Sequence, residues 1–330
     1  MLNLIGVFFT IIGTILGCGF FSGKEIVVFF SKFGYWSFLG ILFLFFVLFF
    51  LFRFLLNLDC KVVEKVQKSK VFLIINIFVC IVFSSAMIAS INESLADQCL
   101  LIKTLLAVVV FVFCLLILFK GGKFLSRLNT FIVPFMIFAF LILLFSNLDL
   151  SLPSVSLSSL PMVSIFYSFL YCTLNVATSS MVIANLGSSL SKKQRALIAF
   201  LSAFVLMLIL FFANIVLLQN QDSFGAVMPF MSIFSVWQKV VLKFNILLGA
   251  STTLFSLIYN FNISLRGLCN NFFIFILSIV FPIIVSFWGF ENIVCFLYPT
   301  ASVFSIFILF SLYFEKYNVF VKKIFFKQNE

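Results

Sequence analysis

The sequence predicts an all-α, polytopic membrane protein with about ten transmembrane helices in a single domain covering residues 1–330. Of the 330 residues, 64% are hydrophobic and only 9% are charged, whereas a soluble domain is about half apolar and a quarter charged. Apolar runs close to the ~18 residues that cross a bilayer recur along the whole chain. The segments between these runs are too short to hold a soluble domain.

Ten apolar runs are separated by short segments that carry charge or Gly, Pro and Ser. An even number of spans places both termini on the same side of the membrane. The predicted spans cover roughly residues 2–33, 36–56, 71–92, 104–119, 130–146, 162–185, 196–218, 240–260, 272–289 and 292–314.

The positive charges support this count because Lys and Arg accumulate in cytoplasmic loops. The side without the termini receives five of the 21 Lys and Arg residues, and the side with the termini receives the other 16. We therefore expect both termini in the cytoplasm. Lys greatly outnumbers Arg, and Phe occurs 53 times, which indicates AT-rich codons and a bacterial inner membrane.

The composition also bears on other functions. The net charge of +11 follows from the cytoplasmic loops, so nucleic-acid binding is not needed to explain it. The chain has no His and no Cys-x-x-Cys pair, so Ser-His catalysis and common metal-ligand spacings are missing. We expect no enzyme and no cofactor, with Na⁺ as the only candidate ion.

The first span is too long for one straight helix. Its 32 residues would extend about 48 Å, against a hydrocarbon core of ~30 Å. The midpoint carries Gly17 and Gly19, and each glycine costs about 1 kcal/mol of helix propensity. We expect a break near Gly17–Gly19; the alternative is that Gly6, Gly13 and Gly17 form a small-residue stripe that packs against another helix.

Two segments resemble a known family. The stretch Gly17-Cys-Gly-Phe-Phe-Ser-Gly-Lys-Glu25, followed by Phe29-Phe-Ser-Lys-Phe-Gly34, resembles the signature of the YkvI-like bacterial membrane proteins. Tyr171-Cys-Thr-Leu-Asn175 is similar to a second patch of that family. These proteins are similar to amino acid-polyamine-organocation transporters with the LeuT fold.

The resemblance implies a five-plus-five inverted repeat. Repeat one would cover about 1–147 and repeat two about 160–314, followed by a short basic cytoplasmic tail at 315–330. Spans one and six would form the central site. Span six has no Gly between Pro161 and Gly187, so the sequence does not predict its unwinding.

The resemblance and the polar faces of the spans together give two sets of candidate residues. Ser168, Cys172, Asn175 and Ser179 share a face of span six, with Tyr171 beside it. In sodium-coupled members, carbonyls of span one and hydroxyls of span eight hold the ion. The candidate substrate residues are Gly17, Cys18, Gly19, Phe20, Ser22, Glu25, Ser168, Tyr171 and Asn175. The candidate ion ligands are Gly13, Leu16, Gly249, Thr252 and Thr253.

Each polar residue taken singly has a simpler interpretation, since Ser, Thr and Asn commonly join helices by hydrogen bonds worth about 0.6 kcal/mol. Polar faces on spans one, six and eight together favour a central cavity. Glu25 is expected to face inward, with Lys24 directed to the headgroups, and to bind a cationic group of the solute or the coupling proton. The segment from Ala226 to Trp237 is either an interfacial or re-entrant helix or an ordinary loop helix.

These observations predict a secondary transporter of a small organic solute, such as an amino acid or similar zwitterion, coupled to Na⁺ or H⁺. The alternative is a receptor or assembly component that keeps the fold without transporting. Its expected partners are the solute and the lipid bilayer. The oligomeric state is not predicted.

Overall fold

Every element of secondary structure that the structure describes is helical, in agreement with the all-α prediction. The computed structural model describes residues 2–99, 122–149, 160–265 and 276–327, with scattered positions of 101–120 and 270–274. Seven helical segments in this part are long and apolar enough to cross a membrane. They are α4 (Trp36–Leu56), α6 (Lys70–Ser94), α8 (Gly122–Ser146), α9 (Pro161–Gly187), α10 (Lys192–Gln219), α12 (Val236–Leu265) and a segment over Phe290–Asn318.

That seventh segment is built from three pieces. It begins with α15 (Phe290–Asn292), continues through the π-helical turn η4 (Ile293–Leu297) and ends in α16 (Tyr298–Lys327). The helix α16 therefore runs on through most of the predicted cytoplasmic tail at 315–330. The last helix thus continues past residue 314, where the sequence placed the start of the tail.

Three predicted spans are not among the seven. The first is divided into α1 (Leu2–Ile15), α2 (Cys18–Ser22) and α3 (Lys24–Phe29). The span predicted at 104–119 lies largely outside the described residues. The span predicted at 272–289 is a short apolar piece made of η3 (Ile276–Val280) and α14 (Phe281–Ser286). Ten spans and a five-plus-five repeat therefore remain predictions.

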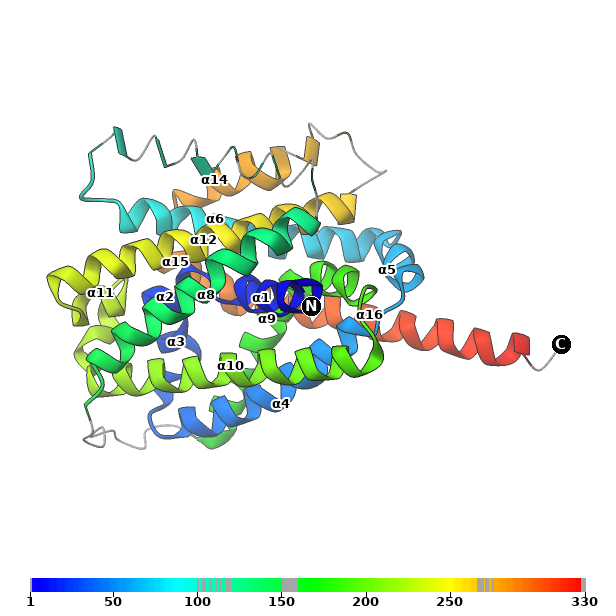
Figure 1. Ribbon diagram of the computed structural model, residues 1–330, viewed down its shortest axis with the longest axis horizontal. Helices are drawn as coiled ribbons and strands as arrows, with labels where there is room; N and C mark the ends of the chain where they lie inside the picture. Colours follow the sequence, from blue (N-terminus) through cyan, green and yellow to red (C-terminus); the bar gives the residue numbers. More distant parts are fainter. Residues whose placement is uncertain are drawn as a thin grey trace.

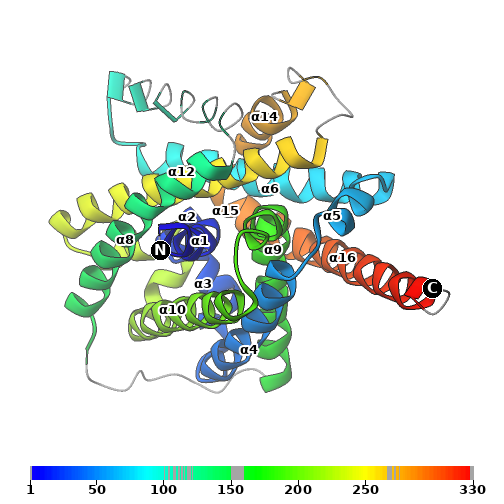
Figure 2. The ribbon, with the colours of Figure 1, turned by 45° about the vertical axis from the view of Figure 1, so that its right-hand side comes forward.

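The described core is arranged around α1 and α9 (Figures 1 and 2). The helices α4 and α10 lie on one side of this centre, and α6, α12 and α14 lie on the other. In α9, 83% of the most apolar window is buried within the protein, compared with 39% in α4. The polar side chains that α9 carries can be accommodated there because other helices surround most of it.

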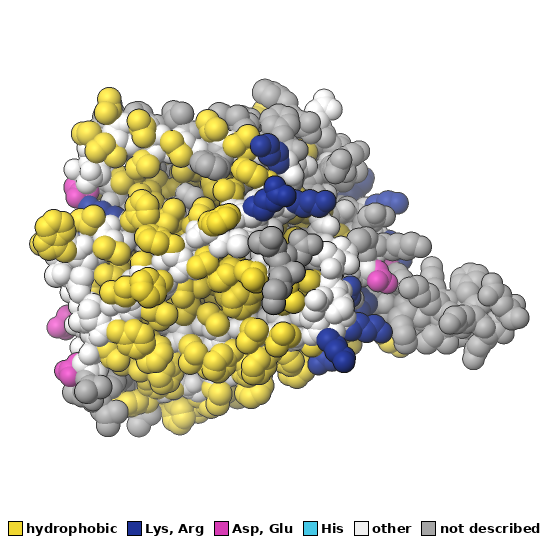
Figure 3. Space-filling view, in the orientation of Figure 1, with side chains coloured by type: hydrophobic (Ala, Val, Ile, Leu, Met, Phe, Trp, Pro, Cys, Tyr) yellow, Lys and Arg dark blue, Asp and Glu magenta, His cyan; other side chains and the backbone are white. Residues whose placement is uncertain are grey.

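The surface separates apolar from charged side chains along the long axis. Large hydrophobic side chains such as Phe46, Phe50 and Phe138 are more than half exposed, and yellow atoms cover the middle of the molecule in Figure 3. Lys and Arg gather toward the end from which the C-terminal helix projects, whereas most acidic side chains in view lie at the other end. This polarity is what alternating basic and acidic loops would produce.

The segment predicted as a helix from Ala226 to Trp237 is not one helix. A 3₁₀ turn, η2 (Gln221–Gly225), precedes the five-residue helix α11 (Pro229–Ile233), and α12 already begins at Val236. Phe230 of α11 is fully buried, with its ring 5.6 Å from that of Phe140. The segment is thus a packed loop helix that covers the core at this end.

Candidate functional site

The first helix breaks at Leu16 and Gly17, inside the segment where the sequence predicts a break. The Gly17 N–H donates to Ile15 O at 2.8 Å and not to the carbonyl of Gly13 four residues earlier. Gly17 has an extended backbone (φ −89°, ψ −176°), which any residue can adopt. Gly17 is closely packed, since a Cβ here would lie 3.2 Å from Met87 Cε and 3.3 Å from Thr253 Oγ1.

A second interruption follows at Gly23, which separates α2 from α3. Gly23 has φ +85° and ψ −11°, a left-handed conformation that disfavours any residue with a Cβ. Gly19 lies within α2, so the break does not extend to it. The chain thus turns twice, at Gly17 and at Gly23, between the first helix and Glu25.

Glu25 points into the protein from the first turn of α3. Its side chain is 1% exposed, and its carboxylate folds over Gly19 so closely that a Cβ on Gly19 would overlap it. Neither carboxylate oxygen has a hydrogen-bond partner among the described residues. Burying an unpaired charge is costly, so this position calls for a proton or a cationic ligand.

Lys24 does not neutralise Glu25, and it does not point toward the headgroups as predicted. Its side chain is 4% exposed, and Nζ donates to Glu291 Oε1 at 2.7 Å and to Ala226 O at 2.9 Å. The prediction was wrong because α15 supplies a carboxylate for Lys24 inside the fold. Adjacent residues on a helix point in different directions, so Lys24 and Glu25 face different surroundings.

Two tyrosines lie near Glu25. Tyr171 of α9 and Tyr298 of α16 are both within electrostatic range of the Glu25 carboxylate. Both hydroxyls are buried, with no hydrogen-bond partner among the described residues. The Tyr171 ring packs edge-on against Phe30 at 5.2 Å, and the Tyr298 ring stacks on Phe83 at 4.7 Å. The cluster of Glu25, Tyr171 and Tyr298 is called the carboxylate cluster below.

Sequence reasoning missed Tyr298. It directly follows the π-helical turn η4, and such turns are frequent at functional sites. The turn itself has no sequence signature here. A tyrosine within an apolar span was the one available signal, because its hydroxyl needs a polar partner when buried.

Two predicted substrate residues use their hydroxyls within their own helices. Ser168 donates to Ser164 O at 2.8 Å and packs against Gly40 of α4, so it belongs to the α4–α9 interface. Ser22 donates to Gly19 O at 2.9 Å. This part of the predicted polar face of span six therefore serves close helix packing.

The remaining predicted substrate residues are buried around the break. Cys18 faces α6, with its thiol 3.6 Å from Ala86 O. Phe20 packs edge-on against Phe140 at 5.9 Å, on the side covered by α11. The Asn175 side-chain amide donates to Tyr171 O at 3.0 Å, and its Oδ1 has no partner among the described residues.

The predicted ion ligands from spans one and eight are brought together. Thr253 Oγ1 of α12 donates to Gly13 O at 3.4 Å. A Cβ on Gly249 would lie 3.1 Å from Leu16 O, so this carbonyl faces α12 at its smallest residue. Thr252 donates to Gly249 O at 3.1 Å within its own helix. Oxygens from both helices thus surround the end of α1.

An additional oxygen comes from Asn129 of α8, which sequence reasoning did not identify. A Cβ on Gly13 would lie 3.5 Å from Asn129 Cγ, so the amide rests against the end of α1. Both polar atoms of the Asn129 amide are buried without a partner among the described residues. Released helix carbonyls and half-helix ends coordinate Na⁺ in transporters, and these residues fit such an ion.

Comparisons with known proteins do not assign the chain to a family. No family model matches the sequence, and no curated protein matches it.

Proposed function

We propose that this chain is a secondary transporter of a small organic solute, an amino acid or a similar zwitterion, driven by Na⁺ or H⁺. The observation that supports this most is the unpartnered Glu25 carboxylate, buried beside a helix break in the protein core. The YkvI-like resemblance, the ten spans with a LeuT-like inverted repeat, and the inner-membrane location with cytoplasmic termini are part of the same proposal.

The broken first helix supports transport because unwound backbone at membrane depth is tolerated only when it is buried in protein or lines a cavity. Transporters use such breaks to bind ions and substrates near the midplane. The break at Leu16–Gly17 is covered by α6 through Met87 and by α12 through Thr253. A purely structural first span would need neither the break nor a buried carboxylate next to it.

Glu25 narrows the class of solute. Its carboxylate already occupies the space over Gly19, so a second anionic group placed there would be repelled. An ammonium or other cationic group would be attracted to Glu25 and could also use the rings of Tyr171 and Tyr298. The solute is thus expected to present a cationic group to the carboxylate cluster.

Two coupling routes fit the site. Na⁺ would be held by the carbonyls of Gly13 and Leu16 and by the hydroxyl of Thr253, with Asn129 beside them. Its positive charge would then balance the oxygen dipoles exposed at the end of α1. In the other route, Glu25 carries the coupling proton and releases it when the cationic solute binds.

One observation favours a second candidate, a receptor or assembly component that retains the fold without transporting. The helix α9 is continuous over 27 residues, so the span that would complete the central site is not unwound. A continuous α9 would suit a protein that binds its solute without releasing it across the membrane.

Counterflow of radiolabelled amino acids and small amines in proteoliposomes tests the proposal. The wild type should exchange at least one of these solutes, and Glu25→Gln should lower the exchange about tenfold or more, because a charged hydrogen bond of about 1.5 kcal/mol or more is lost. Glu93→Gln, which changes an exposed carboxylate at the end of α6, is the matched control. If Glu25→Gln exchanges solute at the wild-type rate, Glu25 is only an interfacial anchor. If the wild type shows no counterflow, the receptor is favoured.

A further inference from the structure

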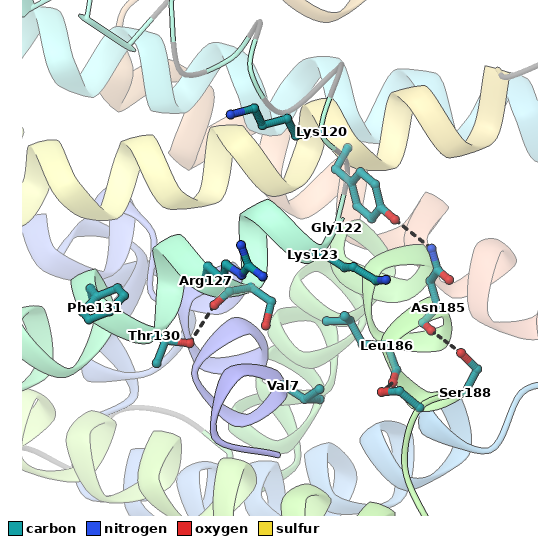
Figure 4. A pocket seen from close by; sticks show the side chains of 13 residues that line it. Val7, Lys120, Gly122, Lys123, Arg127, Thr130, Phe131, Asn185, Leu186 and Ser188 are labelled. Carbon is teal, nitrogen blue, oxygen red and sulfur yellow. Dashed lines mark hydrogen bonds between the residues drawn. The ribbon is translucent and has the colours of Figure 1, made fainter. Parts of the chain in front are cut away.

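A cavity lies far along the chain from Glu25, at the start of α8. It has a volume of about 790 Å³, is partly open to the surface, and is bordered by α1, α8, the end of α9 and α12. In Figure 4, Lys123 and Arg127 come from α8 on one side, and Asn185 and Ser188 come from the end of α9 on the other. None of the residues proposed above for the solute or the ion lines this cavity.

The walls of the cavity are held in place by close packing and one hydrogen bond. Gly122 at the start of α8 lies so near Tyr259 of α12 that a Cβ would be 2.7 Å from the tyrosine hydroxyl oxygen. The side-chain amide of Asn185 donates to that same oxygen at 2.7 Å. Three helices are thus joined at one wall, which makes this a built cavity within the described fold.

The cavity is lined by cations without any anion. Lys120, Lys123 and Arg127 all contribute to its lining, and no Asp or Glu does so among the described residues. Lys123 and Arg127 are four residues apart on α8, so they lie on the same face, where like charges repel. A fold that concentrates three positive charges around a hollow is suited to an anion.

The chemistry of the lining favours a phosphate group. Lys and Arg donate charge-assisted hydrogen bonds to phosphate oxygens, and Arg can do so with two parallel bonds. Ser188 and Ser189 donate to backbone carbonyls of α9 at 2.8 Å, which leaves the binding of the anion to the cationic side chains. Phe131, one turn beyond Arg127, is 80% exposed, so apolar surface begins at the edge of the cavity.

We infer that this cavity binds an anionic phosphate group, carried either by a phospholipid headgroup or by a soluble phosphorylated molecule. Basic pockets between transmembrane helices bind anionic headgroups in this way. The exposed Phe131 would contact an acyl chain if the phosphate belongs to a lipid. This inference does not depend on the proposed transport function.

The test measures the thermal unfolding midpoint of the full chain in two arms. One arm uses neutral detergent and compares potassium phosphate with potassium chloride at equal ionic strength. The other uses nanodiscs of phosphatidylcholine with and without phosphatidylglycerol. Stabilisation by phosphatidylglycerol alone identifies a lipid headgroup, and stabilisation by phosphate as well shows that the phosphate group is sufficient.

The variant Lys123→Gln with Arg127→Gln should weaken binding of the stabilising probe roughly tenfold or more, since each basic residue contributes substantially to the attraction of an anionic headgroup. Lys192→Gln with Lys193→Gln is the matched control, because it removes two exposed charges from α10 that do not line the cavity. Lys123→Arg with Arg127→Lys keeps both charges and should retain binding. The inference is overturned if neither probe stabilises the wild type, or if both Gln double variants lose binding equally.

Discussion

The broken first helix and the continuous helix α9 both lie at the centre of the protein, and both carry polar side chains. In α9, the hydroxyls of Thr173, Thr178 and Ser180 donate to carbonyls three residues earlier at 2.7–2.9 Å. In α1, Thr10 and Thr14 donate to carbonyls four and three residues earlier, at 2.6 and 2.8 Å. Hydroxyl groups therefore do not distinguish the helix that breaks from the helix that continues.

The difference comes from glycine and charge. The α9 segment has no Gly before Gly187 and no charged residue, whereas the first span has Gly17, Gly23 and Glu25. Hydroxyl groups can donate hydrogen bonds to backbone carbonyls of their own helix, so they are compatible with an unbroken core helix. A left-handed glycine and an inward carboxylate cannot be accommodated in that way, and they mark where the protein departs from regular structure.

The largest expected effect on stability comes from Gly23→Ala, which tests whether the glycine is needed for the second turn. The left-handed backbone at residue 23 costs about 1–2 kcal/mol for a residue with a Cβ, and the added Cβ would lie 2.9 Å from Phe230 Cδ2. We expect a loss of about 2 kcal/mol, seen as a lower thermal unfolding midpoint in detergent. Gly225→Ala is the matched control, because nothing lies within 4 Å of its Cβ. Equal midpoints for the two variants would contradict this account.

The next effect is expected at Glu291, which anchors the broken helix through Lys24. Glu291→Gln leaves the buried ammonium of Lys24 without a carboxylate. Because the Glu291 side chain is 42% exposed, solvent screening limits the loss to about 1–2 kcal/mol. Asp97→Asn removes a more exposed pair with Lys243 and should change stability less than Glu291→Gln does, because solvent screens this pair more strongly. The same measurement compares both variants, and a larger loss in Asp97→Asn would show that Lys24 does not need its partner.

The effect of Na⁺ on stability is expected to be smaller. It tests whether the carbonyls of Gly13 and Leu16, at the break, bind an ion. Na⁺ should raise the unfolding midpoint more than K⁺ at equal ionic strength, by on the order of 1 kcal/mol when Na⁺ exceeds its Kd several-fold. Thr253→Ala should abolish the difference between the two salts. Ser251→Ala, whose hydroxyl donates to Leu247 O on the same helix, should preserve it. Identical midpoints of the wild type in the two salts would remove the sodium site and leave protons as the coupling ion.

The smallest effect is expected in α9. Ser179 is buried and donates to Asn175 O at 2.8 Å, so Ser179→Ala removes only a bond within one helix. We expect a change of about 0.6 kcal/mol or less, measured by the same unfolding midpoint. A loss of stability comparable to that of Gly23→Ala would mean that the Ser179 hydroxyl contributes more than one hydrogen bond within a helix.

Much of the fold could be predicted from the sequence, because lipid imposes a simple rule on spanning segments. The span predicted at 36–56 coincides with α4, and the spans predicted at 71–92, 162–185 and 196–218 lie within α6, α9 and α10. Among the candidate residues, Gly13, Leu16, Gly249 and Thr253, which the resemblance to sodium-coupled transporters implied, lie close together. The inward position of Glu25 also followed from its sequence position.

Other features were decided by tertiary contacts that a single helix does not encode. Lys24 turns inward because Glu291, 267 residues away in the chain, meets it there. Ser168 serves the α4–α9 interface because Gly40 allows the two helices to approach closely. Tyr298 and Asn129 reach the site from α16 and α8, whose sequences carry no motif for it. Composition and periodicity thus determine which segments cross the bilayer, whereas the direction in which each polar side chain points depends on which neighbour offers it a partner.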